Sequence, residues 1–425
     1  MASRAEEVAR ERRPVNRVAK ILGPGFITGA ADDDPSGIGT YAVAGAALGL
    51  ATLWTALLTF PLMAAVQNVC ARLGLVAGSG LAGILKRHYP RWVLYPAVGL
   101  VLVANTVNLG ADLGAIADAA HLVAGVPARW LVVPIAIAIV AVQVFASYRV
   151  LERTFKVLTL ALFAYVADAI LVRPPLGETL RATFVPTLSL DREYLTTLVA
   201  ILGTTISPYL FFWQASQEVE EDKASGRRRR GATPFEIRIA TIDVDIGMFV
   251  SNLVMYFIIL ATAVTLHANG KTDLQTGADA AAALRPLAGD LAGLLFGVGL
   301  IGTGLLAIPV LSGSAAYAVS EVFGWRRGLD EDWRRAKAFY AVIAAATLVG
   351  TLIDFTDVKP IDALFWSSVL NGVAAPPLLV LIMLAARNPR VMGHQTIGPV
   401  LTALGWATTI AMFAALLGLI YAIVV

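Results

Sequence analysis

Three consecutive carboxylates, Asp32 to Asp34, lie in an apolar stretch that extends from Ile21 to about Leu50. A charged side chain at bilayer depth costs at least about 2.5 kcal/mol, so it is rarely kept there without a function. Pro35 removes a helical hydrogen bond, and Gly37 admits backbone angles that other residues resist. A broken membrane helix is tolerated where its freed carbonyls line a cavity or meet protein partners. Carboxylate and carbonyl oxygens together predict a site for a hard cation.

A second apolar stretch, 195–217, carries the run Gly-Thr-Thr-Ile-Ser-Pro-Tyr at positions 203–209. A plain kink would explain Pro208 alone, but not its match with the interruption at Asp34 and Pro35. The two interrupted stretches are the first and sixth spans, which are corresponding members of two five-helix halves. That arrangement is typical of inverted-repeat transporters with a substrate site near the midplane. The acidic run 218–222 after the second break is either a cation exit vestibule or an ordinary interfacial helix end.

Other polar residues lie in apolar spans. Asn105, Asn108 and Asp112 follow the spacing i, i+3, i+7 and share one helix face. Asp112 is therefore a candidate proton carrier or the partner of an arginine. Asp243 is expected to form a structural salt bridge with the nearby Arg238.

Span ten, 360–385, is expected to be interrupted where Asn371 and Gly372 precede Pro376 and Pro377. Asn371 is expected either to face the central cavity or to form a hydrogen bond between helices.

The composition indicates a polytopic all-α membrane protein. The chain has 425 residues, of which 57% are hydrophobic and 15% charged, with a mean hydropathy of +0.72. Apolar runs recur along the whole length. Eleven spans are predicted: 21–50, 52–74, 92–121, 129–148, 154–173, 195–217, 241–266, 287–320, 336–354, 360–385 and 397–424. Residues 1–20 are expected to form a cytoplasmic tail. The transport core is expected at 21–385, with one repeat at 21–173 and the other at 195–385, and 397–424 is expected to be an additional transmembrane helix.

The basic residues predict the orientation. With these spans, 26 of the 33 Lys and Arg residues lie on one side of the membrane. Because cytoplasmic loops are enriched in Lys and Arg, the N-terminus is expected in the cytoplasm and the C-terminus on the outer side. The protein is expected to span the inner membrane several times. The cluster 227–230 fits a topogenic signal better than a nucleic-acid site.

Several classes of protein are excluded. A single cysteine, Cys70, allows no internal disulfide and no thiolate cage, and the four histidines lack metal-ligand spacing. No phosphate-binding glycine loop or Ser/His/Asp set occurs. We therefore expect no enzyme and no cofactor, and transport energy from ion gradients or the membrane potential.

These motifs resemble the Nramp (natural resistance-associated macrophage protein) divalent-metal transporters. The resemblance lies in Gly23 to Pro35, Gly203 to Pro208, Ala111-Asp112-Leu113 and the run 70–78. It covers essentially the whole chain. It implies about 11 transmembrane helices in a LeuT-like 5+5 inverted repeat with broken helices 1 and 6.

The departures from that family concern the metal site. The first-helix motif Asp-Pro-Gly-Asn is replaced by Asp34-Pro35-Ser36-Gly37, and the sixth-helix Met-Pro-His by Ser207-Pro208-Tyr209. In the third helix, Ala115 stands where the family has Glu. Replacing a thioether by a hydroxyl shifts the preference toward Mg²⁺ or Ca²⁺, and two proton carriers are lost. This pattern is similar to the Nramp-related magnesium transporter branch.

The sequence thus predicts a secondary transporter of hydrated Mg²⁺, with Mn²⁺ as a further substrate, without tight proton coupling. The alternatives are a proton-coupled Mn²⁺/Fe²⁺ symporter, an organic-solute symporter on the same fold, and a non-transporting receptor. Asp34 is the expected principal metal ligand. The other expected site residues are Asp32, Asp33, Gly37, Thr204 and Ser207 for the metal, Asp112 for the proton or an ion pair, and Tyr41, Tyr209 and Asn371 as cavity lining.

Overall fold

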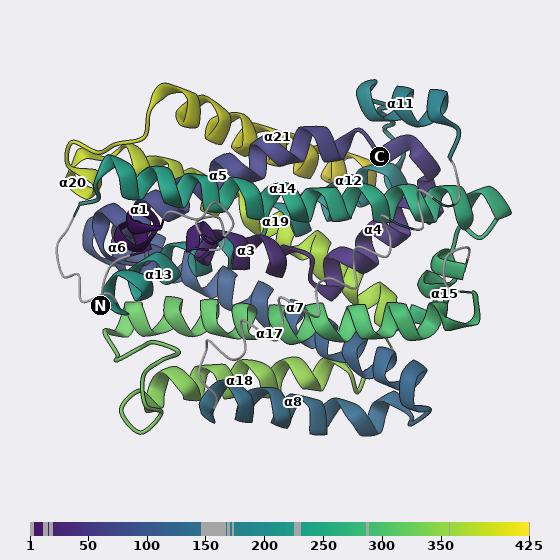
Figure 1. Cartoon of the computed structure of the whole chain (residues 1–425), viewed down its shortest axis with the longest axis horizontal. Helices are drawn as coiled ribbons and strands as arrows, with labels where there is room; N and C mark the ends of the chain where they lie inside the picture. The colour runs from purple at the N-terminus through teal and green to yellow at the C-terminus, as the bar shows by residue number, and fades with distance from the viewer. Residues whose placement is uncertain are drawn as a thin grey trace.

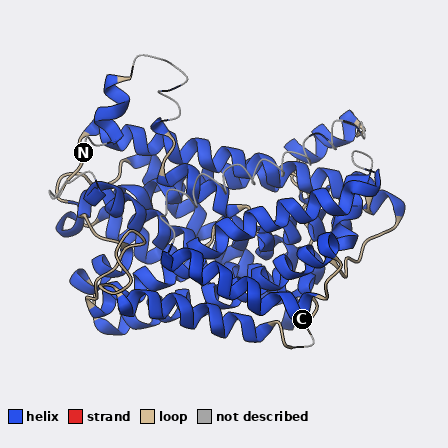
Figure 2. Ribbon diagram, turned by 60° about the horizontal axis from the view of Figure 1, so that its bottom comes forward, coloured by secondary structure: helices blue, strands red, loops and turns tan. Residues whose placement is uncertain are grey.

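The computed structural model describes residues 4–11, 20–145, 174–224, 231–285, 289–356 and 358–424, with the single positions 16, 167 and 171. These residues form helices and loops, with no strand among them (Figure 2). Most of the long helices run along the longest axis of the molecule (Figure 1). α1 (Arg4–Arg10) lies at one end of the bundle, and α21 (Pro399–Val424) ends at the other. The expected all-α class is confirmed.

The first half of the chain contains both halves of the broken first helix. Its elements are α3 (Pro24–Asp32), α4 (Pro35–Leu48), the 3-10 turn Gly49–Thr52, α5 (Thr55–Ala77), α6 (Leu81–His88), α7 (Arg91–Ala124) and α8 (Ala128–Phe145). The predicted fifth span, 154–173, lies almost wholly outside the described residues.

The second half repeats this pattern with a broken sixth helix. Its elements are α11 (Leu176–Phe184), α12 (Arg192–Thr205), α13 (Pro208–Ala224), α14 (Pro234–Thr265), the 3-10 turn His267–Asn269, α15 (Gly277–Ala281), the 3-10 turns Ala282–Leu284 and Gly289–Leu291, α17 (Ala292–Phe323), α18 (Lys337–Ile353), α19 (Pro360–Arg387) and α20 (Pro389–Met392), followed by α21.

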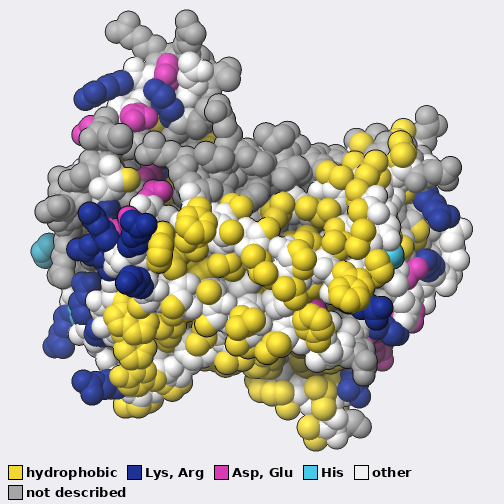
Figure 3. Space-filling view, turned by 90° about the horizontal axis from the view of Figure 1, so that it is seen from below, with side chains coloured by type: hydrophobic (Ala, Val, Ile, Leu, Met, Phe, Trp, Pro, Cys, Tyr) yellow, Lys and Arg dark blue, Asp and Glu magenta, His cyan; other side chains and the backbone are white. Residues whose placement is uncertain are grey.

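The helices agree with the predicted spans. Eight stretches of the described chain are long and apolar enough to cross a membrane, with α12 and α13 counted as one. The broken pair α3–α4 and the 17-residue α18 correspond to predicted spans one and nine. A broad apolar belt covers the face seen in Figure 3, with Lys and Arg gathered at the end where α1 lies. This is the surface expected of a membrane protein with charged ends.

Within the described residues, each of the two helix breaks has a proline that begins the next helix. Pro35 and Pro208 occupy the first positions of α4 and α13, where a missing N–H leaves no hydrogen bond unmade. The expected interruption of span ten is wrong, because α19 continues through Pro376 and Pro377. Packing by neighbouring helices carries a membrane helix through such prolines.

Glycines allow the half-helices to approach their neighbours closely. A Cβ atom added to Gly203 of α12 would lie 2.1 Å from the Ser368 carbonyl oxygen and 2.3 Å from the Gly372 nitrogen of α19. One added to Gly29 of α3 would lie 2.3 Å from the backbone of Gly247 in α14. Backbone contact of this kind is how small residues join membrane helices. α12 is thereby fixed on α19, and α3 on α14.

We expect Gly203→Ala to lower the midpoint of thermal unfolding in detergent, because the added methyl group overlaps the α19 backbone. Overpacking of this kind costs about 1–3 kcal/mol. Gly99→Ala is the matched control, since an added Cβ there meets nothing within 4 Å. Equal midpoints for the two variants would contradict the close contact of α12 with α19.

Candidate metal site

Asp34 lies between the two halves of the first helix and is completely buried. Its Oδ1 accepts hydrogen bonds from the Ser36 hydroxyl (2.7 Å) and the Gly37 amide (2.6 Å), so it caps the N-terminus of α4. Its Oδ2 accepts from Asn108 Nδ2 (3.0 Å) and the Tyr209 hydroxyl (3.2 Å). Four donors match the approximate acceptor capacity of a carboxylate. A cation can therefore reach Asp34 only by displacing one or more of them.

A polar network joins this carboxylate to the third and tenth spans. The Asn108 Oδ1 accepts from Asn371 Nδ2 at 3.0 Å, which brings the predicted Asn371 into the network. Asp112 accepts from the Ser36 amide at 3.1 Å and from Asn108 Nδ2 at 3.4 Å. Both donors are neutral groups. The arginine partner that the sequence left open for Asp112 is therefore not among these hydrogen bonds of the described residues. Asn108 and Asp112 of the face predicted from the spacing are thus directed at the first break, whereas Asn105 donates to the Leu311 carbonyl and to Ser314 of α17.

The other two aspartates turn toward a different helix. Ser251 of α14 donates to Asp32 Oδ2 at 2.6 Å and lies 3.3 Å from Asp33 Oδ1. Both aspartates are buried. Within the part of the chain that the structure describes, no three His, Cys, Asp or Glu side chains come close enough to hold a metal. Any cation at Asp34 would therefore need neutral oxygen ligands as well.

Such oxygens surround Gly37. A Cβ atom added there would lie 3.0 Å from Thr204 Oγ1, 3.1 Å from the Asp32 carbonyl oxygen and 3.3 Å from Asp34 Oδ1. Both helix breaks thus supply oxygens to one point, which we call the Gly37 notch. Asp32 Oδ1 and Asn371 Oδ1 are also buried without a hydrogen-bond partner among the described residues. Buried oxygens left unpaired are costly, and a cation or water removes that cost.

The second break is closed by its own residues. Ser207 donates to the carbonyl oxygens of Gly203 (2.7 Å) and Thr204 (2.5 Å), which the unwound turn leaves without amide partners. Its hydroxyl oxygen keeps acceptor capacity for a ligand. The single hydroxyl proton of Tyr209 is shared between Asp34 and the Ala31 carbonyl, which lies at 2.8 Å, and so ties the second break to the first. Tyr41, one turn beyond Gly37, is completely buried.

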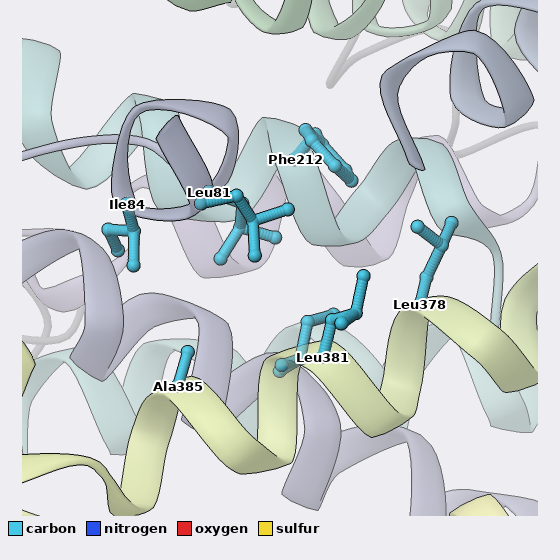
Figure 4. A pocket seen from close by; sticks show the side chains of 8 residues that line it. Leu81, Ile84, Phe212, Leu378, Leu381 and Ala385 are labelled. Atoms are coloured by element: carbon cyan, nitrogen blue, oxygen red, sulfur yellow. The ribbon is translucent and has the colours of Figure 1, made fainter. Parts of the chain in front are cut away.

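A depression of about 590 Å³ is lined by other residues of the two half-helices that meet at the site. Val43 and Ala47 of α4 and Thr196 and Thr197 of α12 line it, while the N-terminal end of α4 and the C-terminal end of α12 carry the Gly37 notch. Arg192, Glu193, Asp273 and Asp362 stand around it. A different hollow, between α6, α13 and α19, holds only about 10 Å³ and is lined by apolar side chains (Figure 4). With no polar partner for water or an ion, that hollow is a packing gap.

Two site features were not predicted from the sequence. Ser251 is an ordinary serine in an apolar span, and nothing in the sequence signals its contact with Asp32. The expected partner of Asp243 is wrong, because Arg4, and not Arg238, binds it at 2.7 Å. That pair spans 239 positions of the chain, a separation at which local spacing gives no information.

Comparison with known proteins identifies the fold. A manganese transporter of Eremococcus coleocola superposes with a TM-score of 0.75 at 18% identity, covering 97% of this chain and 88% of that one. MhsT in complex with L-phenylalanine gives 0.59 at 16% identity, covering 93% and 98%. At these identities the likeness concerns the fold alone. The LeuT-like architecture with broken helices 1 and 6 is thereby confirmed.

Comparison of sequences identifies the family. A divalent metal cation transporter MntH of Deinococcus radiodurans is 26% identical over 415 residues, which are 95% of this chain and 89% of that protein. The family model described as natural resistance-associated macrophage protein-like matches residues 25–422. The chain therefore belongs to the Nramp family.

Proposed function

We propose that this chain is a secondary transporter of divalent metal cations in the inner membrane, with its N-terminus in the cytoplasm. The observation that supports this most is the Gly37 notch, where oxygens of both broken helices meet beside the buried carboxylate of Asp34. Asp34, Thr204, Ser207 and the Asp32 carbonyl would be the ligands. An inside-negative potential favours entry of a divalent ion by about 4.6 kcal/mol per 100 mV, twice the value for a single charge.

Manganese is the ion we propose first. The relatives compared above are described as divalent metal or manganese transporters and do not support the expected magnesium branch. An oxygen-only site is compatible with this choice, because carboxylate, carbonyl and water ligands suit Mn²⁺ as well as Mg²⁺ and Ca²⁺. Magnesium is the second candidate, since the methionine that would disfavour it is replaced by Ser207.

Binding is proposed to exchange hydrogen-bond donors for a cation. The Ser36 hydroxyl and Asn108 amide belong to side chains that can rotate, whereas the Gly37 amide is fixed in α4. When these side chains turn away, the Asp34 carboxylate loses two neutral hydrogen-bond donors and binds the cation in their place. The Asn108 side chain would keep its bond to Asp112, which we propose as the proton carrier. Asp32 and Asp33 would contribute negative potential from the Ser251 side, and Tyr41 and Asn371 would line the occupied cavity.

Asp34→Asn is expected to reduce Mn²⁺ uptake into proteoliposomes to background, because the site loses its principal charge. Asp245→Asn is the control: it removes a carboxylate from α14 that is bound to Asn68 at 2.8 Å, away from the breaks. Near-normal uptake by Asp34→Asn would refute the site.

Ser207→Met is expected to raise the ratio of Mn²⁺ to Mg²⁺ uptake, because a thioether is a softer ligand than a hydroxyl. Ser207→Leu is similar in size and also loses the bonds to Gly203 and Thr204, but it carries no sulfur. The comparison of Met with Leu therefore isolates the sulfur. The same ratio in both variants would show that residue 207 is not a ligand.

Asp112→Asn is expected to keep Mn²⁺ uptake while abolishing the accompanying acidification of the vesicle lumen. Asp118→Asn on the same helix is the control, since that carboxylate binds the Gly277 amide at 3.1 Å. A pH dye inside the vesicles measures the protons. Unchanged acidification would remove Asp112 from the coupling, and uptake without acidification in the unmodified protein would favour uncoupled transport, as first expected for magnesium.

A further inference from the structure

The Arg4 guanidinium joins the N-terminal helix α1 to the bundle through three carboxylates. Arg4 binds Asp243 of α14 at 2.7 Å through Nη1 and Glu221 of α13 at 3.1 Å through Nε, and its Nη2 lies 3.7 Å from Glu218. Only 14% of its side chain is exposed, and those of Glu218 and Asp243 are buried. Burial by itself lowers the pKa of Arg4, but the three carboxylates raise it above its ordinary value. Arg4 therefore stays charged.

Apolar contacts add little to this attachment. α1 has seven residues, and its buried apolar side chains, Ala5 and Val8, pack against Ile239 and the partly buried Ile21. Such a small cluster cannot by itself hold a helix in place. α1 packs on α14 and reaches α13 through Arg4, at the end of the bundle where Figure 1 marks the N-terminus.

Asp243 connects Arg4 to the first broken helix. Its carboxylate accepts from the amides of Gly23 (2.8 Å), Gly25 (2.9 Å) and Phe26 (3.0 Å), and so caps the N-terminus of α3. The cap is charge-assisted and aligned with the helix dipole. α3 ends at Asp32, next to the metal site.

Glu218 connects Arg4 to the second broken helix. Gln214 donates to Glu218 at 3.0 Å and accepts from Thr28 of α3 at 2.5 Å. All three side chains are buried on the path between Arg4 and the breaks. α13 itself begins beside Tyr209, the donor to Asp34. Both half-helices at this end therefore connect the metal site to Arg4.

We propose that Arg4 is the latch of the cytoplasmic gate: it holds α13 against the α3–α14 pair and keeps the exit path closed. Without it, Glu218, Glu221 and Asp243 repel one another, and α13 separates from α3 at the Thr28–Gln214 contact. Breaking one partner out of a buried ion cluster is strongly unfavourable because the remaining charges lose their compensation. Release of α1 would then expose three carboxylates to the leaving cation. The latch does not depend on which cation is carried.

The test measures access to the closed interface. Ile27 of α3 is 5% exposed and lies in the same apolar cluster as Trp213 of α13. With Ile27→Cys in a Cys70→Ser background, the rate of maleimide labelling in detergent reports opening between these helices. Arg4→Gln should increase that rate at least about tenfold, a 1.4 kcal/mol shift toward the open form. Arg4→Lys, which keeps the charge, should give a smaller increase.

Arg10→Gln, on the exposed part of the same helix, is the matched control and should leave the rate unchanged. Glu221→Gln is the second variant, since its side chain is 31% exposed and its loss is tolerated more easily than that of a buried group. Like Arg4→Gln, Glu221→Gln should increase the rate of maleimide labelling at position 27. Equal rates for Arg4→Gln, Glu221→Gln and Arg10→Gln would overturn the latch, whatever the transport assays show.

Discussion

The structure depends on a buried carboxylate placed where a helix stops. Asp34 caps α4, receives Asn108 from α7 and receives Tyr209 from α13, so one side chain joins three elements. An uncompensated charge at that depth would be several kcal/mol unfavourable. Ser36 and Gly37 provide part of the compensation locally, and the fold must bring Asn108 and Tyr209 to the break to complete it. The packing of the bundle and the chemistry of the site are therefore one problem.

The sequence was informative where chemistry and covalent geometry act locally. A proline at the first position of a half-helix, preceded by a polar residue, identified both breaks. Prolines inside α19 gave a false interruption, because the missing hydrogen bonds are tolerated when packing on both sides continues. The distinction lies in the residue before the proline: Asp34 is extended, with φ −67° and ψ 167°, whereas Ala375 remains helical.

Contacts between distant segments could not be predicted in the same way. The run of three aspartates indicated a cation site but not that Asp32 and Asp33 face Ser251 while Asp34 faces Asn108. A one-residue step rotates a side chain by about 100° on a helix, and the break changes that rotation again. Which way each carboxylate points is therefore set by the turn at Asp33 and by the neighbouring helices, not by spacing.

The glycine contact between α3 and α14 restricts how the molecule can open. Gly25 and Gly29 lie with their backbones directly on Val244 and Gly247, and Asp243 caps the same α3. At Gly25 and Gly29 backbone meets backbone, and Ser251 of α14 also binds Asp32 of α3, so neither helix can tilt without carrying the other. α3 and α14 would then move together as one rigid body. During transport, the interface that changes would be the one between the α3–α14 pair and α13.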